Sequence, residues 1–189
     1  MSQLLEDHAL LIESVREGGA LALSYFHCGV KHWDKGYDDP VSEADHAVND
    51  LLRQKLLDHR PQYGWLSEET EDDPKRLGCR DVWVVDPIDG TRAFIQQRAE
   101  FTICAALVRD DRPVAAAVYN PAKEEFFDAV QGGGARLNGE SIHVTSIPDF
   151  KGARLLTGRN LFKNADPLHK PSDVTIHMVN SIAYRMCLV

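Results

Sequence analysis

The segment from residue 82 to residue 95 constrains the fold of this chain more than any other part of its sequence. The apolar and β-branched run Val82-Trp83-Val84-Val85 predicts a buried strand that ends in the carboxylate of Asp86. Pro87 is expected to stop the pairing of this strand, because proline has no N–H to donate. Gly90 permits a tight reversal of the chain shortly afterwards. The segment therefore predicts a strand, a turn and the start of a further element.

The same segment predicts a place where polar groups converge. Thr91 is expected to cap a short helix that continues to Ile95, beside the carboxylates of Asp86 and Asp89. Carboxylates bind hard divalent cations, and the free N–H groups of a helix start bind phosphate oxygens. An ordinary Asp-Pro turn followed by a helix cap would have the same spacing without any ligand. The spacing alone leaves both interpretations open.

The complete string Asp-Pro-Ile-Asp-Gly-Thr, residues 86–91, resembles the signature of the inositol monophosphatase family. Members of this family are Mg²⁺-dependent phosphomonoesterases, so the resemblance implies an α/β (α+β) fold, a layered αβαβα sandwich. Residues 63–70 resemble the family's Gly-Glu-Glu element, with Ser67 where glycine is usual. Residues 39–45 resemble its Asp-x-Val-Thr-x-x-Asp element, with Ser42 in place of threonine. Three such segments in the family's order make a chance match a poor explanation.

The resemblance implies a magnesium site built from all three segments. Glu68 and the Ile88 carbonyl would complete a first metal site, and Asp86 would bridge it to a second. Asp89 would complete the second site, and Asp45 matches a residue near a weaker third ion. A shell made only of oxygen atoms suits Mg²⁺. Two or three Mg²⁺ ions are therefore expected, with Mn²⁺ as a possible substitute.

The resemblance also implies how these residues would act on a phosphate ester. Two ions ~4 Å apart can polarise the phosphate, generate a nucleophilic water and stabilise the leaving oxygen. Glu68 and Thr91 would orient and deprotonate that water, with Asp86 as the third catalytic residue. The amides of Gly90 and Thr91 would hold phosphate oxygens, and Asp89 would contact the substrate. No nucleophilic serine or cysteine is required.

Charge and cysteine spacing restrict the classes of partner. The net charge of −8 argues against binding to a nucleic acid polymer or to an anionic membrane. It leaves a small phosphorylated metabolite as the expected partner, because bound cations invert the local sign. The apolar stretches are too short to span a membrane and the N-terminus lacks a basic signal-peptide start, which favours a cytoplasmic protein, with a homodimer as a possible assembly. The four widely spaced cysteines predict free thiols.

Hydrophobic periodicity predicts alternating helices and strands. One long amphipathic helix is expected over residues 5–26, with Gly18 and Gly19 at a close helix crossing. A Gly-Gly-Gly run at residues 132–134 is expected to form a hairpin turn rather than a phosphate-binding loop, since no helix pattern follows it. The remaining predicted elements are a helix over Glu43–His59 and strands over Phe101–Val108, Pro113–Tyr119 and Glu125–Val130.

The chain is expected to contain one domain and the start of another. Residues 1–145 are predicted to form an N-terminal α+β domain that carries the metal site, and residues 146–189 the incomplete start of a C-terminal α/β domain. Residues 181–189 resemble the helix that precedes the family's last strands. The family's following Trp-Asp-x-Ala-Ala element, whose aspartate binds the second metal and contacts substrate, does not occur in this sequence. We therefore expect a C-terminal truncation and an apolar surface near residues 182–189.

The function expected from these features is Mg²⁺-dependent hydrolysis of a small phosphate monoester, such as inositol monophosphate, by a metal-activated water. A 3′(2′),5′-bisphosphate nucleotidase is one alternative, because residues 100–102 resemble the corresponding stretch of that branch. A histidinol-phosphate phosphatase is another. An inactive metal-binding remnant would agree with the missing aspartate. A plain α/β interaction module would leave three acidic motifs unexplained.

Overall fold

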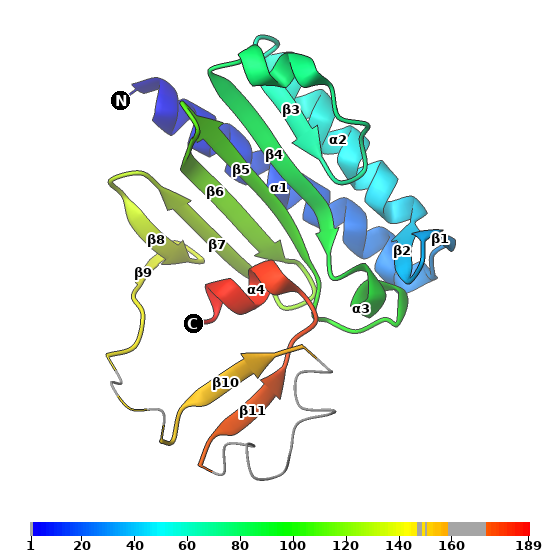
Figure 1. Ribbon diagram of the computed structural model, residues 1–189, viewed down its shortest axis with the longest axis vertical. Helices are drawn as coiled ribbons and strands as arrows, with labels where there is room; N and C mark the ends of the chain where they lie inside the picture. The colour runs from blue at the N-terminus through cyan, green and yellow to red at the C-terminus, as the bar shows by residue number, and fades with distance from the viewer. Residues whose placement is uncertain (1, 147–148, 150, 159–172) are drawn as a thin grey trace.

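A helix pair covers one face of a seven-stranded sheet in the computed structural model, which describes residues 2–146, 149, 151–158 and 173–189 (Figure 1). The two helices are α1 (Ser2–Cys28) and α2 (Glu43–His59). Both bounds of α2 agree with the sequence prediction, and α1 includes the predicted range 5–26. The described residues thus confirm a layered α/β architecture with a central mixed sheet.

The central sheet contains its seven strands in the order of the sequence. The first two strands pair in parallel, and every later neighbour pairs antiparallel. The strands are β3 (Gly64–Ser67), β4 (Asp81–Asp89), β5 (Thr102–Arg109), β6 (Arg112–Asn120), β7 (Glu125–Val130), β8 (Gly134–Leu137) and β9 (Glu140–Ile142). The three predicted strands correspond to β5, β6 and β7. Gly132 and Gly134 take φ of 80° and 74° between β7 and β8, which confirms the predicted hairpin turn.

The remaining elements lie around this framework. A hairpin of β1 (His32–Gly36) and β2 (Asp39–Ser42) precedes α2, and a separate parallel pair consists of β10 (Arg154–Thr157) and β11 (Thr175–Met178). The short helices are η1 (Pro74–Gly78), α3 (Thr91–Ile95) and α4 (Ile182–Cys187). The predicted domain boundary at residue 145 stays a prediction, since residues 147–148, 150 and 159–172 lie outside the described residues.

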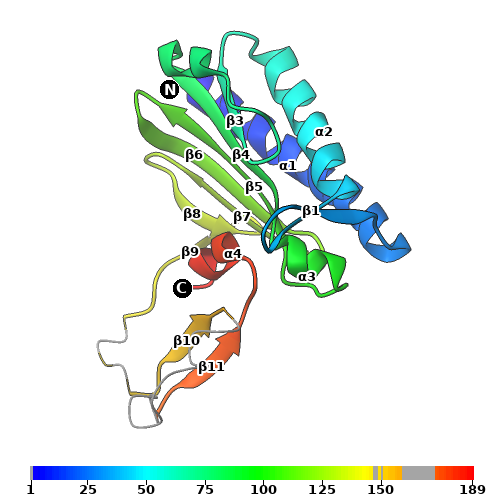
Figure 2. The same cartoon turned by 45° about the vertical axis from the view of Figure 1, so that its right-hand side comes forward.

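The two faces of the sheet differ in what covers them. Phe126 belongs to the main core beneath α1, whereas Phe127 packs against Tyr184 of α4. Successive side chains of a strand point to opposite faces, so α4 lies on the face opposite α1 and α2, as Figures 1 and 2 show. The core on the helix side includes the fully buried Trp83 and Leu52. Burying one large apolar side chain contributes about 1.5–3 kcal/mol, so this side holds the sheet to the helices.

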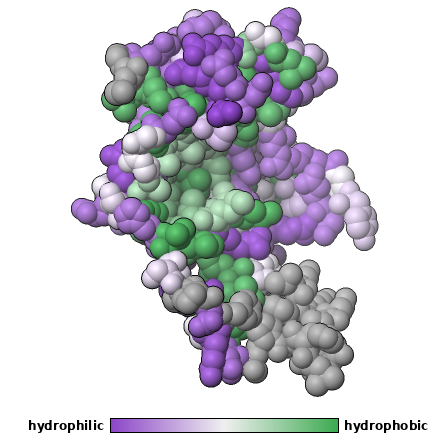
Figure 3. Space-filling view, turned by 60° about the vertical axis from the view of Figure 1, so that its left-hand side comes forward, coloured by the Kyte–Doolittle hydropathy of each residue, from purple (hydrophilic) through white to green (hydrophobic). Residues whose placement is uncertain are grey.

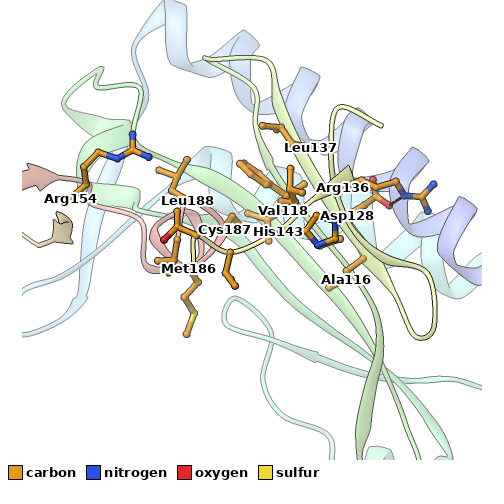
Figure 4. Close-up of a pocket in the computed structure, with 17 residues that line it drawn as sticks. Ala116, Val118, Asp128, Arg136, Leu137, His143, Arg154, Met186, Cys187 and Leu188 are labelled. Atoms are coloured by element: carbon orange, nitrogen blue, oxygen red, sulfur yellow. Dashed lines mark ion pairs between the residues drawn. The ribbon is translucent and has the colours of Figure 1, made fainter. Parts of the chain in front are cut away.

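The opposite face carries an apolar hollow of about 510 Å³ (Figures 3 and 4). Strand side chains and the end of α4 line it, among them Val118, Phe127, Leu137, Ile142, Met186 and Leu188. Met186 and Val189, which both line it, and the neighbouring Ile182 are exposed, which confirms the apolar surface expected near residues 182–189. Within the described ranges, no helix is both long and apolar enough to cross a membrane. All four cysteines are free thiols, as predicted.

Pro87 interrupts the pairing of its strand, as expected, but the predicted end of the strand at Asp86 was wrong. β4 continues through Pro87, and Asp89 pairs again with Thr102 of β5. The register shifts between Asp86 and Asp89, so the proline occupies an irregular step that needs no ladder bond from it. The strand therefore carries the whole Asp-Pro-Ile-Asp sequence to the edge of the sheet.

The two adjacent glycines of α1 approach different elements. A Cβ on Gly18 would lie 3.4 Å from Val48 Cγ1 of α2, which confirms the predicted close helix approach at this position. A Cβ on Gly19 would lie 2.4 Å from Tyr119 Cδ1 of β6. The prediction of a helix crossing was therefore wrong for Gly19, where the helix approaches the sheet instead.

This difference predicts opposite effects of two neighbouring substitutions. Gly19→Ala should lower the free energy of unfolding by about 1–3 kcal/mol, because the new methyl group overlaps the Tyr119 ring. Gly18→Ala should raise it by up to about 1 kcal/mol, since alanine favours the helix and meets only ordinary contacts. Urea unfolding followed by circular dichroism measures both values. Equal effects of the two substitutions would contradict this assignment.

Candidate functional site

Parallel pairing brings Glu68 and Asp86 to the same edge of the sheet. Ser67 at the end of β3 pairs with Val85 of β4, and the Glu68 amide donates a hydrogen bond to the Val85 carbonyl at 3.4 Å. The next residue on each strand, Glu68 after the end of β3 and Asp86 within β4, therefore lies beside the other, because neighbouring parallel strands run in register. The structure thus places two of the predicted ligands on adjacent strands.

The electrostatics of Asp86 show that four carboxylates share this region. Burial raises the pKa of Asp86, and the charges of Asp89, Glu68 and Asp45 raise it further, to about 8. A hydrogen bond from the Ile88 backbone opposes this shift. The other three predicted carboxylates are therefore close enough to Asp86 to affect its charge.

Asp45 joins the cluster from the first turn of α2. Its side chain is buried, and its Oδ2 accepts hydrogen bonds from the Ser42 amide, at 2.9 Å, and from the Ser42 hydroxyl. Its Oδ1 accepts from Thr91 Oγ1 at 3.1 Å. Burial raises the pKa of Asp45, while the hydrogen bonds from Ser42 lower it. Asp45 therefore connects α2 to the first residue of α3, the short helix that follows β4.

The predicted capping role of Thr91 was wrong. The residue before helix α3 is Gly90, with φ of +100°, and Thr91 is the first helical residue. Gly90 suits this place because a side chain would be strained at that φ and its Cβ would lie 2.8 Å from the Glu100 carbonyl oxygen. Thr91 Oγ1 instead lies 3.1 Å from Asp45 Oδ1 and 3.0 Å from the Ile88 carbonyl oxygen. Its hydroxyl therefore links two predicted metal-site groups.

Asp89 is bound to the C-terminal helix of the described chain. Its Oδ2 accepts hydrogen bonds from Ser181 Oγ and from the Ala183 amide, each at 2.6 Å. Sequence reasoning placed residues 181–189 on a helix but gave Ser181 no role at the site. The available signal was a serine directly before the first helical residue, Ile182. This pattern predicts a helix cap and not a contact with Asp89.

Lys35 was also missed. Its Nζ lies 2.7 Å from Glu69 Oε1 and 3.5 Å from Glu68 Oε1, so the β1–β2 hairpin supplies a cation to the acidic strand end. The Glu68 side chain stays 53 % exposed, whereas that of Glu69 is only 4 % exposed. Lysine in an exposed hairpin has no local pattern that points to a distant glutamate.

Ser67, which stands where the family usually has glycine, holds the strand end to α2. Its Oγ donates to Asn49 Oδ1 at 2.7 Å and accepts from the Glu69 amide at 3.3 Å. The departure from the family pattern therefore leaves the backbone that carries Glu68 in place.

The donor set fits a hard divalent cation, although two of its carboxylates accept hydrogen bonds from other residues of the chain. Among the residues that the structure describes, no group of three or more His, Cys, Asp or Glu side chains is already arranged to hold a metal ion. Asp45 and Asp89 instead accept hydrogen bonds from neighbouring protein groups. The carboxylates and the Ile88 carbonyl are the oxygen donors that such ions prefer, and a cation would relieve the repulsion that raises the pKa of Asp86.

The apolar hollow on the sheet is separate from this acidic cluster. None of the predicted site residues lines it, and its wall contains mostly apolar side chains (Figure 4). Polar groups that could orient a small charged molecule gather instead at the ends of β3 and β4. The candidate site is therefore the carboxylate cluster and not the hollow.

Two curated relatives share sequence with the chain over much of its length. The inositol-1-monophosphatase of Rhizobium meliloti is 40% identical over 124 residues, which are 66% of this chain and 46% of that protein. The histidinol-phosphatase of Chlorobaculum parvum is 30% identical over 168 residues, which are 88% of this chain and 64% of that protein. The chain spans about half the length of the first relative and under two thirds of the second.

A structural relative and a family profile cover the chain more completely. The IMPase of Thermotoga maritima superposes on 100% of this chain and 72% of its own, with a TM-score of 0.83 and 24% identity, which shows the shared fold. The sequence profile of the inositol monophosphatase family matches residues 4–188. The three acidic segments, the fold that brings them together and this match lead to one conclusion: the chain belongs to the inositol monophosphatase family.

Proposed function

We propose that this chain carries the metal-binding part of a phosphatase that hydrolyses a small phosphate monoester, with inositol monophosphate as the leading candidate. The observation that carries the proposal is the environment of Asp86, where three further carboxylates act on one half-buried aspartate. Buried like charges are costly, so such a cluster favours a bound cation. Family membership supports the reaction type.

Glu68, Asp86, Asp89 and the Ile88 carbonyl would hold the metal, with Asp45 beside them. Two or three Mg²⁺ ions, or Mn²⁺ in their place, would supply Lewis acidity and a water of lowered pKa. Among the four carboxylates, Glu68 is the one at a half-exposed strand end. It is therefore suited to accept a proton from a water that arrives from solvent.

The hydroxyl of Thr91 would act together with Glu68 on the attacking water. Its contacts with Asp45 and with the Ile88 carbonyl fix its oxygen beside the cluster. The amides of Gly90 and Thr91 would bind phosphate oxygens, and Asp89 would contact the rest of the substrate. A group already held in place contributes more to a proton transfer than one that must be ordered first.

The choice among phosphate esters rests on the relatives. The relative from Chlorobaculum parvum is named a histidinol-phosphatase, which keeps histidinol phosphate as a candidate. The resemblance of residues 100–102 to bisphosphate nucleotidases weighs less, because Phe101 is a fully buried core residue and Arg98 pairs with Glu100 at 3.0 Å. Packing accounts for that stretch. A cytoplasmic location and a homodimer belong to the proposal as well.

A phosphatase panel tests the reaction and its substrate. Inositol 1-phosphate, histidinol phosphate and adenosine 3′,5′-bisphosphate are offered to the chain with and without Mg²⁺, and phosphate release is measured. The same panel is run on the chain extended through a Trp-Asp-x-Ala-Ala element. We expect Mg²⁺-dependent release, greatest with inositol 1-phosphate and greater in the extended chain. No release from any ester by either chain would overturn the proposed activity.

Asp86→Asn should change the pH dependence of stability without metal. The pKa of Asp86 lies near 8 in the folded chain, so the folded state binds this proton more tightly than the unfolded state does. The contribution of Asp86 to stability is therefore greatest below pH 4 and is lost as the pH rises to 8. The variant should be more stable than the parent at pH 8, by on the order of 2–4 kcal/mol. Urea unfolding in EDTA between pH 4 and 8 measures this. A parallel pH dependence of the two proteins would contradict the carboxylate cluster.

Thr91→Val removes the hydroxyl of Thr91 but keeps the shape of its side chain, so it tests the role of the hydroxyl alone. Losing a positioned proton-transfer group typically lowers the rate about 10²–10⁴-fold, so kcat should fall by that range. The free energy of unfolding should fall by about 1 kcal/mol, because Asp45 loses one hydrogen bond. Thr91→Ser keeps the hydroxyl and should retain most of both properties. Steady-state kinetics of the extended chain measure kcat, and full turnover in Thr91→Val would leave Thr91 a purely structural role.

A further inference from the structure

Ser181 lies at the junction between Asp89, the sheet and α4. It is fully buried, and its Oγ has three polar partners in the described chain. It lies 2.6 Å from Asp89 Oδ2, 3.0 Å from Thr102 Oγ1 and 3.0 Å from the Tyr184 amide nitrogen. A buried hydroxyl with three partners has little freedom to rotate.

The partners fix the direction of each hydrogen bond. A serine hydroxyl has one proton and two lone pairs. The Tyr184 amide can only donate, so it takes one lone pair. Asp89 Oδ2 already accepts from the Ala183 amide and acts as an acceptor, so the serine proton goes to it. Thr102 must then donate to the second lone pair of Ser181. The proton and both lone pairs of the Ser181 hydroxyl are therefore used, and the single proton is donated to Asp89.

The carboxylate of Asp89 is thereby held by one oxygen only. Both of its side-chain hydrogen bonds within the described ranges go to Oδ2, and both come from residues 181–183. Oδ1 accepts none from the described residues. An arrangement of this kind orients a carboxylate and leaves its second oxygen for another partner, as hydrogen-bonded neighbours do for metal ligands.

We propose that Ser181 is a positioning residue for Asp89: its committed proton fixes the carboxylate so that Oδ1 stays available to a divalent cation, and cation binding is thereby coupled to the docking of α4. This inference rests on the proposed metal site. The coupling follows because the same carboxylate anchors the start of α4 through Oδ2. Coupling between two binding events is reciprocal, so a cation at Asp89 should also stabilise the docked helix.

Mn²⁺ titration by calorimetry tests the positioning role in the full chain and three variants. Ser181→Ala removes the proton that Asp89 receives, and loss of a group that orients a metal ligand typically costs about 10–100-fold in affinity. We expect the dissociation constant of Mn²⁺ to rise by about tenfold or more. Ser181→Thr keeps a hydroxyl and should restore affinity to within about threefold of the parent.

Tyr184→Phe is the matched control for a loosened helix. It removes the hydrogen bond from the Tyr184 hydroxyl to Glu125, which also holds α4 to the sheet, but leaves Ser181 and Asp89 unchanged. This variant should lose thermal stability without metal, while its Mn²⁺ affinity should fall much less than that of Ser181→Ala because the contact between Ser181 and Asp89 is kept. A loss of affinity in Tyr184→Phe equal to that in Ser181→Ala would show that only the docking of α4 matters and would overturn the positioning role.

Hydrogen exchange tests the coupling. Saturating Mn²⁺ should slow exchange of the amides of residues 184–188 in the parent, and this slowing should be lost in Ser181→Ala. Normal Mn²⁺ binding with unchanged affinity in Ser181→Ala overturns the positioning role and leaves the metal site intact. Failure of the parent to bind Mn²⁺ overturns both proposals, so the two failures are distinguishable.

Discussion

Repulsion among the carboxylates at the ends of β3 and β4 is the interaction on which the rest of the site depends. Parallel pairing of the two strands brings Glu68 and Asp86 side by side, and the burial of Asp86 weakens the screening of its charge by water. Surrounding residues stabilise this negative charge. Lys35 forms ion pairs with Glu68 and Glu69, Thr91 donates a hydrogen bond to Asp45, and Ser181 donates one to Asp89. These donors partly offset the repulsion within the acidic cluster. A bound cation would offset the rest of it, which agrees with a role of the cluster in cation binding.

The helix layer makes this arrangement rigid. α2 packs on the sheet through buried apolar residues such as Val48 and Leu52, and its first turn carries Asp45 to the cluster. The close approach of α1 at Gly18 lets the two helices share one face of the sheet, with α1 over β5 and β6 and α2 over β4. Tight packing transmits position over several residues, so the place of one carboxylate is fixed by apolar contacts far from it. The packing of the core therefore fixes the position of Asp45 at the site.

Local patterns predicted most of the fold and part of the site. The bounds of α2 and of β7 follow from hydrophobic periods and turn residues, which act within a few neighbours. The path of β4 through Pro87 does not, because a shift in register with β5 accommodates the proline. The contacts of Lys35 with Glu69 and of Ser181 with Asp89 join residues distant in sequence. Only the assembled sheet brings such pairs together, and no spacing in the sequence encodes them.

Thr91 shows how the assembled site gives a residue a function that its sequence position does not. Its hydroxyl has one proton and two acceptors within reach, Asp45 Oδ1 and the Ile88 carbonyl oxygen. A cation at the Ile88 carbonyl would compete for that oxygen. The Thr91 hydroxyl would then donate its hydrogen bond to Asp45 instead. Donation to Asp45 would fix the direction in which the lone pairs of Thr91 Oγ1 point, and so the place from which a water could donate to them. Cation binding and the orientation of the attacking water would thus be two consequences of one choice of hydrogen-bond acceptor.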